Sequence, residues 1–154
     1  MCDLVVAPSK AIFEEMIEWG VKESKIRMVP MGIDHFFVDP PSQGEIIKIK
    51  NAYSSPLILY VGRLSQEKNL KLLIYSFEKI FERYSSAKLM VVGRGPEEGK
   101  LKKLVRKIGL EKFVEFKGFL DWQNLKLLYW TADVFCMPSL GETQGLSILE
   151  AKAC

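Results

Sequence analysis

Cysteine is scarce in this sequence of 154 residues, and the few cysteines that occur are scattered. Cys2, Cys136 and Cys154 lie far apart and form no C-x-x-C pair, which argues against a disulfide framework and against a zinc site. No apolar run approaches the ~20 residues that a membrane-spanning helix needs. The N-terminus has no basic segment followed by a long apolar stretch, so we expect no signal peptide. These absences predict a protein of the reducing cytoplasm.

An excess of charge of either sign is also lacking. The 22 lysines and arginines exceed the 19 acidic residues by only three, too little to argue for nucleic-acid binding. His35 is the single histidine, and because no second ligand and no acidic neighbour stands at a motif spacing from it, we expect it to be structural or exposed. What is present is the balance of an ordinary globular protein, 48% hydrophobic and 27% charged, with enough chain for one domain's core.

The hydrophobic residues gather in short unbroken runs that alternate with longer amphipathic segments. Unbroken runs are typical of strands buried on both faces of a parallel sheet. Their alternation with helices predicts βαβ units in a doubly wound, Rossmann-like α/β fold. The expected strands are residues 4–7, 26–30, 57–61, 89–92, 114–116 and 134–137.

Four helices are expected between these strands. Ser9 can cap one that ends at Gly20, Asn69 can cap a second, a third ends before Gly109, and the last starts near Gly145. Apolar residues at helical spacing place the middle two, namely Leu70, Leu73, Ile74, Phe77 and Phe81 in one and Leu101, Leu104, Val105 and Ile108 in the other.

Residues 38–55, "VDPPSQGEIIKIKNAYSS", interrupt this alternation. Adjacent prolines, a glycine and serines predict a connection between two α/β units. The sequence ends at Cys154, less than three turns into the last helix, with no strand to complete the crossover. We therefore expect a fragment whose sheet is incomplete at its C-terminus.

Ligands of open α/β sheets bind at the carboxyl ends of the strands. After the strand 57–61, the segment "VGRLSQEKN" places Gly62 and Arg63 at a turn and Lys68 just before a helix. A cation on each side of such a turn, beside a helix start, predicts a site for a phosphate or another oxyanion. The alternative is that Arg63 and Lys68 are solvated cations on a surface loop.

The segment "VVGRGPEEGK", residues 91–100, resembles a phosphate loop only superficially. Gly93, Gly95 and Gly99 miss the G-x-G-x-x-G spacing by one position and the Walker spacing as well. Pro96 and the two glutamates after it favour the first turn of a helix, and those carboxylates would repel phosphate. We interpret the segment as a tight turn between strand and helix.

A cationic run follows, and its apolar partners occupy the opposite face of the expected helix. We therefore expect a solvated face, with contact to an anionic membrane surface as the alternative. The run consists of Lys100, Lys102, Lys103, Arg106 and Lys107.

In "GETQGLSILE", Glu142 and Glu150 stand eight residues apart. Even on one continuous helix they would be separated by about 12 Å, whereas glycosidase carboxylate pairs lie ~5–9.5 Å apart. We expect Glu142 in a loop and Glu150 one to two turns into a helix. The two then act as separate hydrogen-bond acceptors, and the free N–H groups near Gly145 and Leu146 can meet an anion between them.

Four segments in this order resemble the retaining nucleotide-sugar glycosyltransferases of the "glycosyl transferases group 1" kind (family 4), which have two Rossmann-like domains (the GT-B fold). They are "APSKAI…GV…KIRMVPMGID", "YVGRLSQEKNL", "VVGRGPE" and "FKGFL…LYWTADVFCMPSLGETQGLSILEAKAC", and together they cover essentially the whole chain. The resemblance implies three parts. Residues 1–38 would be the end of the acceptor-side N-terminal domain, residues 39–55 an interdomain linker, and residues 56–154 a partial donor-binding domain.

The resemblance also implies roles for single residues. Arg63 and Lys68 match the diphosphate-binding pair, and Glu142 matches the first glutamate of the E-x7-E motif, which contacts the hydroxyls of the donor sugar. Glu150 matches the second glutamate, which accepts hydrogen bonds from the ribose. These matches make Arg63, Lys68 and Glu142 the candidate catalytic residues.

Further positions complete the expected donor site. Gly145 and Leu146 correspond to backbone amides near the phosphates and sugar, and Gly62 and Thr143 flank the matched residues. Gly32 matches an interdomain glycine. The sequence departs from the family at Lys152, where an apolar residue is usual, and at Arg94, where an acidic or small residue is common.

By this resemblance the protein would transfer a hexose-type sugar from a UDP-, GDP- or ADP-sugar to an acceptor, a glycan, lipid or small molecule, with retention of configuration. The chain contains no Asp-x-Asp, so we expect neither a metal nor another cofactor. Two alternatives remain: a nucleotide-sugar-binding module without activity of its own, and an interaction fragment whose partner chain supplies the missing domain. The expected location is the cytoplasm, or the inner face of the membrane by peripheral contact.

Overall fold

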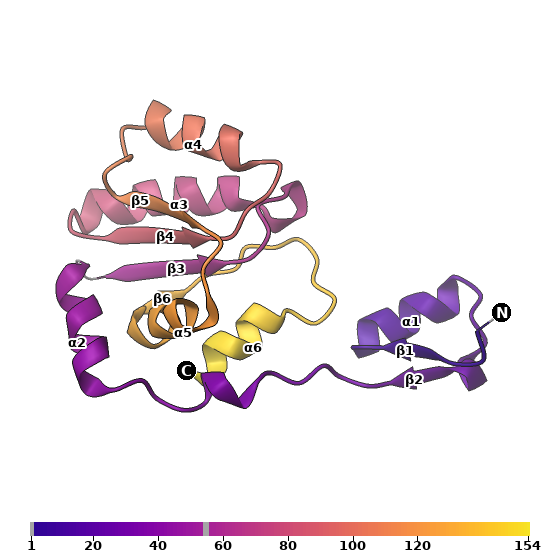
Figure 1. The fold of residues 1–154 in the computed structure, drawn as a ribbon. Coiled ribbons are helices and arrows are strands. Elements are labelled where there is room, and N and C mark those ends of the chain that lie inside the picture. Colours follow the sequence, from indigo (N-terminus) through magenta and orange to yellow (C-terminus); the bar gives the residue numbers. More distant parts are fainter. Residues whose placement is uncertain (1, 54–55) are drawn as a thin grey trace.

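The computed structural model describes residues 2–53 and 56–154, which form two successive parallel sheets (Figure 1). The first sheet pairs β1 with β2, and the second has the strand order β5-β4-β3-β6. All pairings are parallel, which confirms the predicted α/β class. The strands are β1 (Val5–Ala7), β2 (Ile26–Met28), β3 (Leu57–Val61), β4 (Lys88–Val92), β5 (Val114–Gly118) and β6 (Val134–Phe135).

In the described residues, five α-helices lie between successive strands and a sixth follows β6. Their bounds are α1 (Lys10–Glu18), α2 (Gln43–Ala52), α3 (Leu70–Arg83), α4 (Glu98–Lys107), α5 (Trp122–Thr131) and α6 (Leu146–Ala153). Ser9 caps α1 by accepting a hydrogen bond from the N–H of Ile12 at 3.4 Å, as expected. Asn69 stands before α3, but its side chain makes no capping hydrogen bond. The prediction of an Asn69 cap was therefore wrong, because the residue adopts a left-handed conformation with φ +51° that ends the preceding 3₁₀ turn.

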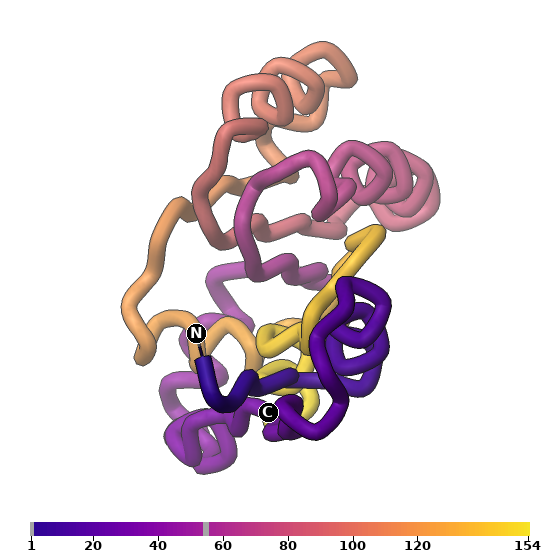
Figure 2. The backbone as a smooth tube through the Cα atoms, turned by 90° about the vertical axis from the view of Figure 1, so that its right-hand side faces the viewer, coloured from indigo at the N-terminus to yellow at the C-terminus, as the bar shows by residue number. Residues whose placement is uncertain are grey.

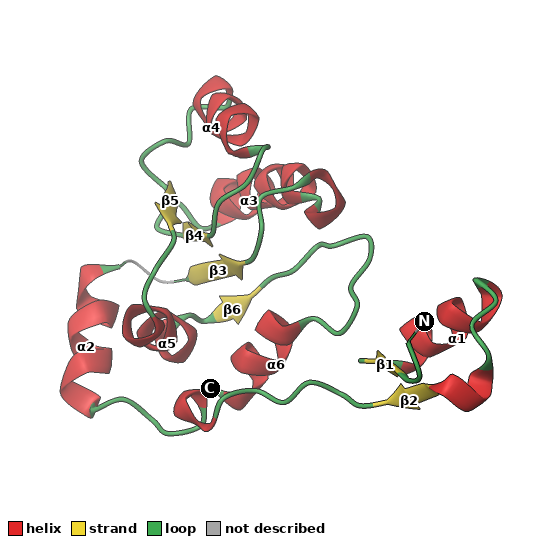
Figure 3. Cartoon of the chain, turned by 45° about the vertical axis from the view of Figure 1, so that its right-hand side comes forward, coloured by secondary structure: helices red, strands yellow, loops and turns green. Residues whose placement is uncertain are grey.

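The second sheet separates two hydrophobic clusters, because successive side chains of a strand point to opposite faces. Tyr60 and Val91 lie on the face covered by α3 and α4. Leu59 and Met90 lie on the other face, against Leu128 of α5. Figure 3 shows this arrangement, with α3 and α4 on one side of the strands and α2, α5 and α6 on the other. Strands β3 and β4 are therefore covered on both faces, as their unbroken apolar runs predicted. The same prediction was wrong for β1 and β2, where Val6 and Met28 are exposed, because among the described helices only α1 packs against this two-stranded sheet.

Helix α2 lies within residues 38–55, for which only a connection was predicted. Ser42 accepts a hydrogen bond from the N–H of Glu45, and the Glu45 carboxylate accepts one from the N–H of Ser42 at 3.0 Å. This reciprocal cap starts the helix, and α2 then packs against α5. The adjacent prolines obscured a Ser-x-x-Glu signature that was visible in the sequence. Residues 54 and 55 lie outside the described residues.

The expected strand 134–137 is shorter than predicted, and helix α5 before it was not predicted. Within β6 only Val134 and Phe135 pair with β3. The N–H of Cys136 still bonds the carbonyl of Leu59 at 2.9 Å, after which the chain leaves the sheet as a loop. This loop and the loops after β3 and β4 start at the same edge of the sheet, where the site residues lie (Figure 1).

Candidate functional site

The loop after β3 is held from below by Tyr60. Its hydroxyl donates a hydrogen bond to the carbonyl of Arg63 at 2.9 Å, and Leu64 is fully buried. A 3₁₀ turn at residues 66–68 then brings Lys68 back over the edge of the sheet. Burial raises the pKa of Tyr60, and the carboxylates of Glu142 and Glu67 raise it further. The hydroxyl therefore stays protonated and remains a donor beneath the loop.

Glycines in the loop after β4 let this loop pack directly against the loop after β3. A Cβ atom on Gly93 would lie 1.9 Å from the carbonyl oxygen of Gly62, and one on Gly95 would lie 2.3 Å from that of Leu64. Backbone hydrogen bonds join the two loops, among them Leu64 N–H to Arg94 C=O at 3.0 Å. Residues 93–97 thus form the tight turn that the sequence predicted, and their glycines serve packing between two backbones.

Lys68 and Glu142 meet at this edge. The Lys68 Nζ atom lies 2.7 Å from Oε1 of Glu142, and their side chains are only 18% and 25% exposed. Burial opposes ionisation of Glu142, but the hydrogen bond and charge of Lys68 outweigh it and lower the pKa of the carboxyl. The N–H of Leu140 bonds the carbonyl of Glu67 at 2.9 Å and fixes the start of the Glu142 loop beside the Lys68 turn.

Glu150 lies in the second turn of α6, whereas Glu142 lies in the preceding loop, as predicted. The hydroxyl of Tyr129 donates a hydrogen bond to Oε2 of Glu150 at 2.8 Å. Gly145 precedes α6 with φ +69°, a conformation that favours glycine. The first N–H groups of α6 have no acceptor within the helix. Leu146 therefore starts a helix that can face an anion between the two glutamates.

Arg63 occupies a different place from Lys68. It is exposed, and among the ion pairs of residues 2–53 and 56–154 it takes part in none. It lines a hollow of about 270 Å³ whose wall is mostly apolar, together with Gly62, Arg94, Phe119 and Leu120. The structure thus brings Lys68 and Glu142 together and places Arg63 at the wall of a neighbouring hollow.

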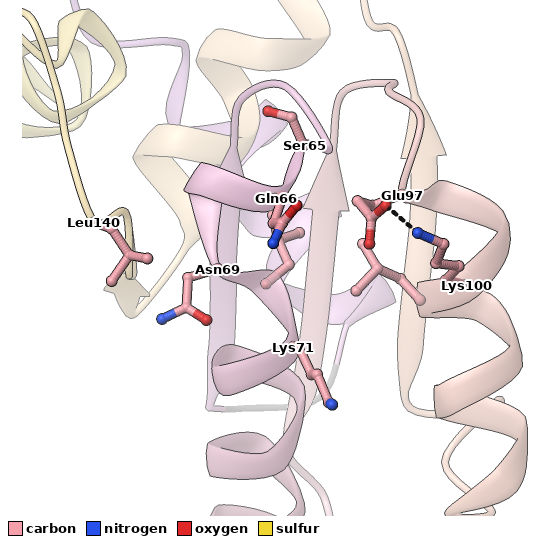
Figure 4. A pocket seen from close by; sticks show the side chains of 9 residues that line it. Ser65, Gln66, Asn69, Lys71, Glu97, Lys100 and Leu140 are labelled. Carbon is pink, nitrogen blue, oxygen red and sulfur yellow. Dashed lines mark hydrogen bonds and ion pairs between the residues drawn. The ribbon is translucent and has the colours of Figure 1, made fainter.

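A second hollow, of about 380 Å³, lies between the starts of α3 and α4 (Figure 4). Ser65, Gln66 and Asn69 line one side, and the ion pair of Glu97 with Lys100, at 2.7 Å, lies on the other. In the cationic run, Lys102 is likewise paired, with Glu98 at 2.6 Å. Two of the five cations are therefore locally neutralised, which favours the solvated face over the membrane contact.

The remaining predicted residues make no ion pair or hydrogen bond with Lys68 or Glu142 among the described contacts. His35 is exposed, as expected, but the expectation that it has no acidic neighbour at motif spacing was wrong. Asp39 stands four residues later, and its Oδ2 atom lies 3.7 Å from Nδ1 of His35. Gly32 is exposed beside Met31, and Thr143 is exposed beside Glu142. No helix in the described part of the chain is both long enough and apolar enough to cross a membrane.

Sequence reasoning missed Tyr129 and Gln144. The Gln144 carboxamide bonds the backbone of Met31, and Tyr129 bonds Glu150. Gln144 lies within residues 141–150, the segment predicted to carry Glu142 and Glu150, so the sequence could have identified it as a candidate. Its partner, 113 residues away, could not be identified in this way.

Known glycosyltransferases share this fold. The chain superposes on Anabaena Alr3699/HepE in complex with UDP and glucose with a TM-score of 0.86 and 23% identity, covering 100% of this chain and 43% of that one. It matches WaaG, a glycosyltransferase involved in lipopolysaccharide biosynthesis, with a TM-score of 0.82 and 22% identity over 96% and 41% of the two chains. The fold is thus the Rossmann-like fold of GT-B glycosyltransferases.

Proteins with similar sequences point to the same family as the structural comparison. The chain is 32% identical over 163 residues to mannosylfructose-phosphate synthase of Agrobacterium fabrum, covering 99% of this chain and 36% of that protein. It is 34% identical over 155 residues to the uncharacterized glycosyltransferase MJ1607 of Methanocaldococcus jannaschii, covering 97% and 40%. The chain therefore spans less than half the length of these relatives. The family model for glycosyl transferases group 1 matches residues 42–154. The chain belongs to the glycosyl transferases group 1 family.

Proposed function

We propose that this chain carries the donor-binding part of an enzyme that transfers a hexose-type sugar from a nucleoside diphosphate sugar to an acceptor. The observation that carries the proposal is the pairing of Lys68 with Glu142 at 2.7 Å, at the carboxyl edge of the sheet and just before α6. The names of similar proteins support it, among them a mannosylfructose-phosphate synthase, an alpha-monoglucosyldiacylglycerol synthase and a HepE structure that contains UDP and glucose.

The leaving group defines what the cations do. When the bond between sugar and diphosphate breaks, negative charge builds on the diphosphate oxygens. Lys68, Arg63 and the N–H groups at the start of α6 are positive groups at one edge of the sheet. Fixed positive groups stabilise this charge more in the transition state than in the ground state, which lowers the barrier. No metal ion is needed in this scheme, and retention of configuration at the sugar is part of the proposal.

The two glutamates bind hydroxyls of the donor at separate places. An ionised carboxylate only accepts hydrogen bonds, which suits sugar and ribose hydroxyls. Glu142 takes the hydroxyls of the sugar, and Glu150, held through one oxygen by Tyr129, takes those of the ribose. Donor binding then separates Lys68 from Glu142, because the ammonium turns to phosphate and the carboxylate to the sugar.

Calorimetric titration tests the donor site. We expect the wild-type chain to bind UDP, GDP or ADP, and Arg63→Ala or Lys68→Ala to weaken binding by about 10-fold or more, the usual effect of losing a hydrogen bond to a charged group. Arg106→Ala, which removes an exposed cation from α4, is the matched control and should leave the affinity unchanged. If none of the nucleotides binds, the proposed donor site is wrong.

Turnover separates an enzyme from a binding module. The chain spans only part of its relatives, so transfer should be measured with the whole protein and with this chain alone, in the presence of glycan, lipid and small-molecule acceptors. Proton NMR of the first product reports retention, and activity in excess EDTA reports metal independence. Inversion at the anomeric carbon would contradict retention, and complete loss of transfer in EDTA would contradict metal independence.

We also propose that the reaction takes place in the cytoplasm.

A further inference from the structure

Gln144 forms a two-point contact with the backbone of Met31. The carboxamide Nε2 donates to the Met31 carbonyl at 2.5 Å, and Oε1 accepts from the Met31 N–H at 2.7 Å. The side chain of Gln144 thus bonds both the backbone N–H and the backbone C=O of Met31. The two residues are 113 positions apart, and the loop before α6 and the segment after β2 lie side by side in both views (Figures 1 and 2).

Met31 lies on the segment that joins the two sheets. Farther along this segment Phe37 is fully buried in the second unit, and its carbonyl accepts a hydrogen bond from the indole of Trp130 at 3.1 Å. Among the described hydrogen bonds that join this segment to the second unit, those with Gln144 lie nearest to β2 in the sequence. The contact therefore shortens the connection between β2 and the first attachment to the second unit from residues 29–36 to residues 29–30.

The other end of the contact is the donor loop. Gln144 stands two residues after Glu142 and directly before Gly145, at which α6 begins. The start of the same loop is tied to the Lys68 turn through the Leu140 N–H. Fixing Gln144 thus fixes the C-terminal end of a loop that carries both a proposed sugar-binding carboxylate and the helix start.

We propose that Gln144 is a positioning residue that couples the segment between the two sheets to the donor loop, so that the first unit and the donor site move together. Its effect on donor binding rests on the proposed function above. The chemistry requires a carboxamide, because only a group with a donor and an acceptor side by side can satisfy both the N–H and the C=O of one residue. An ionised carboxylate would accept from the Met31 N–H but would face the Met31 carbonyl without a proton.

Hydrogen–deuterium exchange tests the coupling without any ligand. In Gln144→Ala, amides of residues 29–34 and 140–146 should exchange about fivefold faster, the factor expected from loss of one net hydrogen bond. Amides of β3 and β4 should not change. Gln123→Ala removes an exposed glutamine from α5 and serves as the matched control. Unchanged exchange at residues 29–34 in Gln144→Ala would overturn the proposal.

Gln144→Glu provides a rescue that a general loss of stability cannot imitate. At pH 7 its carboxylate should behave like alanine or worse. A protonated carboxyl group again offers a donor and an acceptor side by side, so protection of residues 29–34 should return as the pH falls toward about 4.3, the ordinary pKa of a glutamate. Absence of any return, with β3 and β4 still protected, would contradict the carboxamide-specific contact.

Nucleotide binding then tests the functional half. UDP or GDP should slow exchange at residues 29–34 in the wild type but not in Gln144→Ala, and the variant should bind the nucleotide several-fold more weakly. If the wild type binds no nucleotide, the proposed function fails, while the exchange data still decide the contact itself. If Gln144→Ala binds nucleotide as tightly as the wild type, the link to the donor site is wrong.

Discussion

The ammonium of Lys68 and the carboxylate of Glu142 neutralise each other across 74 residues of sequence. In the proposed donor site these same groups bind different parts of one ligand. A nucleoside diphosphate without its sugar would therefore have to compete with Glu142 for Lys68, and would offer Glu142 nothing in return. In the proposed site, the Lys68–Glu142 ion pair is therefore fully replaced only by a ligand with both a diphosphate for Lys68 and a sugar for Glu142.

Glu142→Gln should separate nucleotide affinity from sugar transfer. Releasing Lys68 from a half-buried ion pair worth about 1 kcal/mol should strengthen UDP binding up to about fivefold. Transfer from the UDP-sugar should fall, because the amide replaces an acceptor of sugar hydroxyls. Calorimetry with UDP and initial rates with the UDP-sugar measure the two effects. Glu115→Gln, which breaks the Lys117–Glu115 pair of 2.6 Å, should change neither, and equal weakening of both by Glu142→Gln would contradict the exchange.

The same pair should contribute stability only at pH values where Glu142 is ionised. Its pKa is lowered in the folded chain, although burial opposes this. A lowered folded pKa means stability that is fully present above the unfolded value, about 4.3, and is lost as the pH falls through the folded value. Urea unfolding from pH 7 to pH 3 should therefore show the wild type losing its advantage over Glu142→Gln below about pH 4.3. A constant difference would indicate that the pair is not coupled to protonation.

Gly93→Ala should destabilise the chain far more than Gly99→Ala. The added Cβ on Gly93 meets the Gly62 carbonyl oxygen at 1.9 Å, and the residue has φ +129°. We expect a loss of about 3 kcal/mol in unfolding free energy, as for other substitutions that combine a steric clash with backbone strain. Gly99 lies in α4 with open space around it, so alanine there should be neutral or stabilising by up to about 1 kcal/mol. Thermal unfolding followed by circular dichroism makes the comparison, and similar melting temperatures would contradict the close loop contact.

Tyr129→Phe should loosen Glu150 while preserving the core. The phenol donates to Oε2 at 2.8 Å, and burial, followed by the effect of Glu150, raises the pKa of Tyr129. The hydroxyl thus remains a donor throughout the physiological range. Its loss should cost about 1 kcal/mol of stability and reduce the preference for UDP over 2′-deoxy-UDP in calorimetry. Tyr84→Phe, at an exposed tyrosine, is the control, and an unchanged preference in Tyr129→Phe would argue against Glu150 as the ribose acceptor.

Local sequence patterns predicted the elements whose formation depends mainly on their own residues. The unbroken apolar run of residues 57–61 coincides with β3, and the amphipathic stripe starting at Leu70 coincides with α3. Helix α2 was missed because Pro40 and Pro41 outweighed the Ser42 and Glu45 cap that follows them. Its packing against α5 is a tertiary effect that no local window contains.

The site divides in the same way. Arg63, Lys68, Glu142 and Glu150 were identified individually because they stand at fixed positions beside glycines and helix starts. Which of them meet could not be read from spacing. The Lys68–Glu142 pair depends on two loops from different strands meeting at one edge. Their roles toward a donor remain predictions.

Backbone hydrogen bonds and the close approach of Gly93 and Gly95 to carbonyl groups join the loops after β3 and β4. Arg94 contributes its carbonyl to this contact and also lines the hollow that Arg63 lines. Substitutions at position 94 can therefore change the chemistry of that hollow while the loop geometry stays intact. If the proposed donor site is correct, position 94 is one at which the hollow beside it can change with little cost to folding.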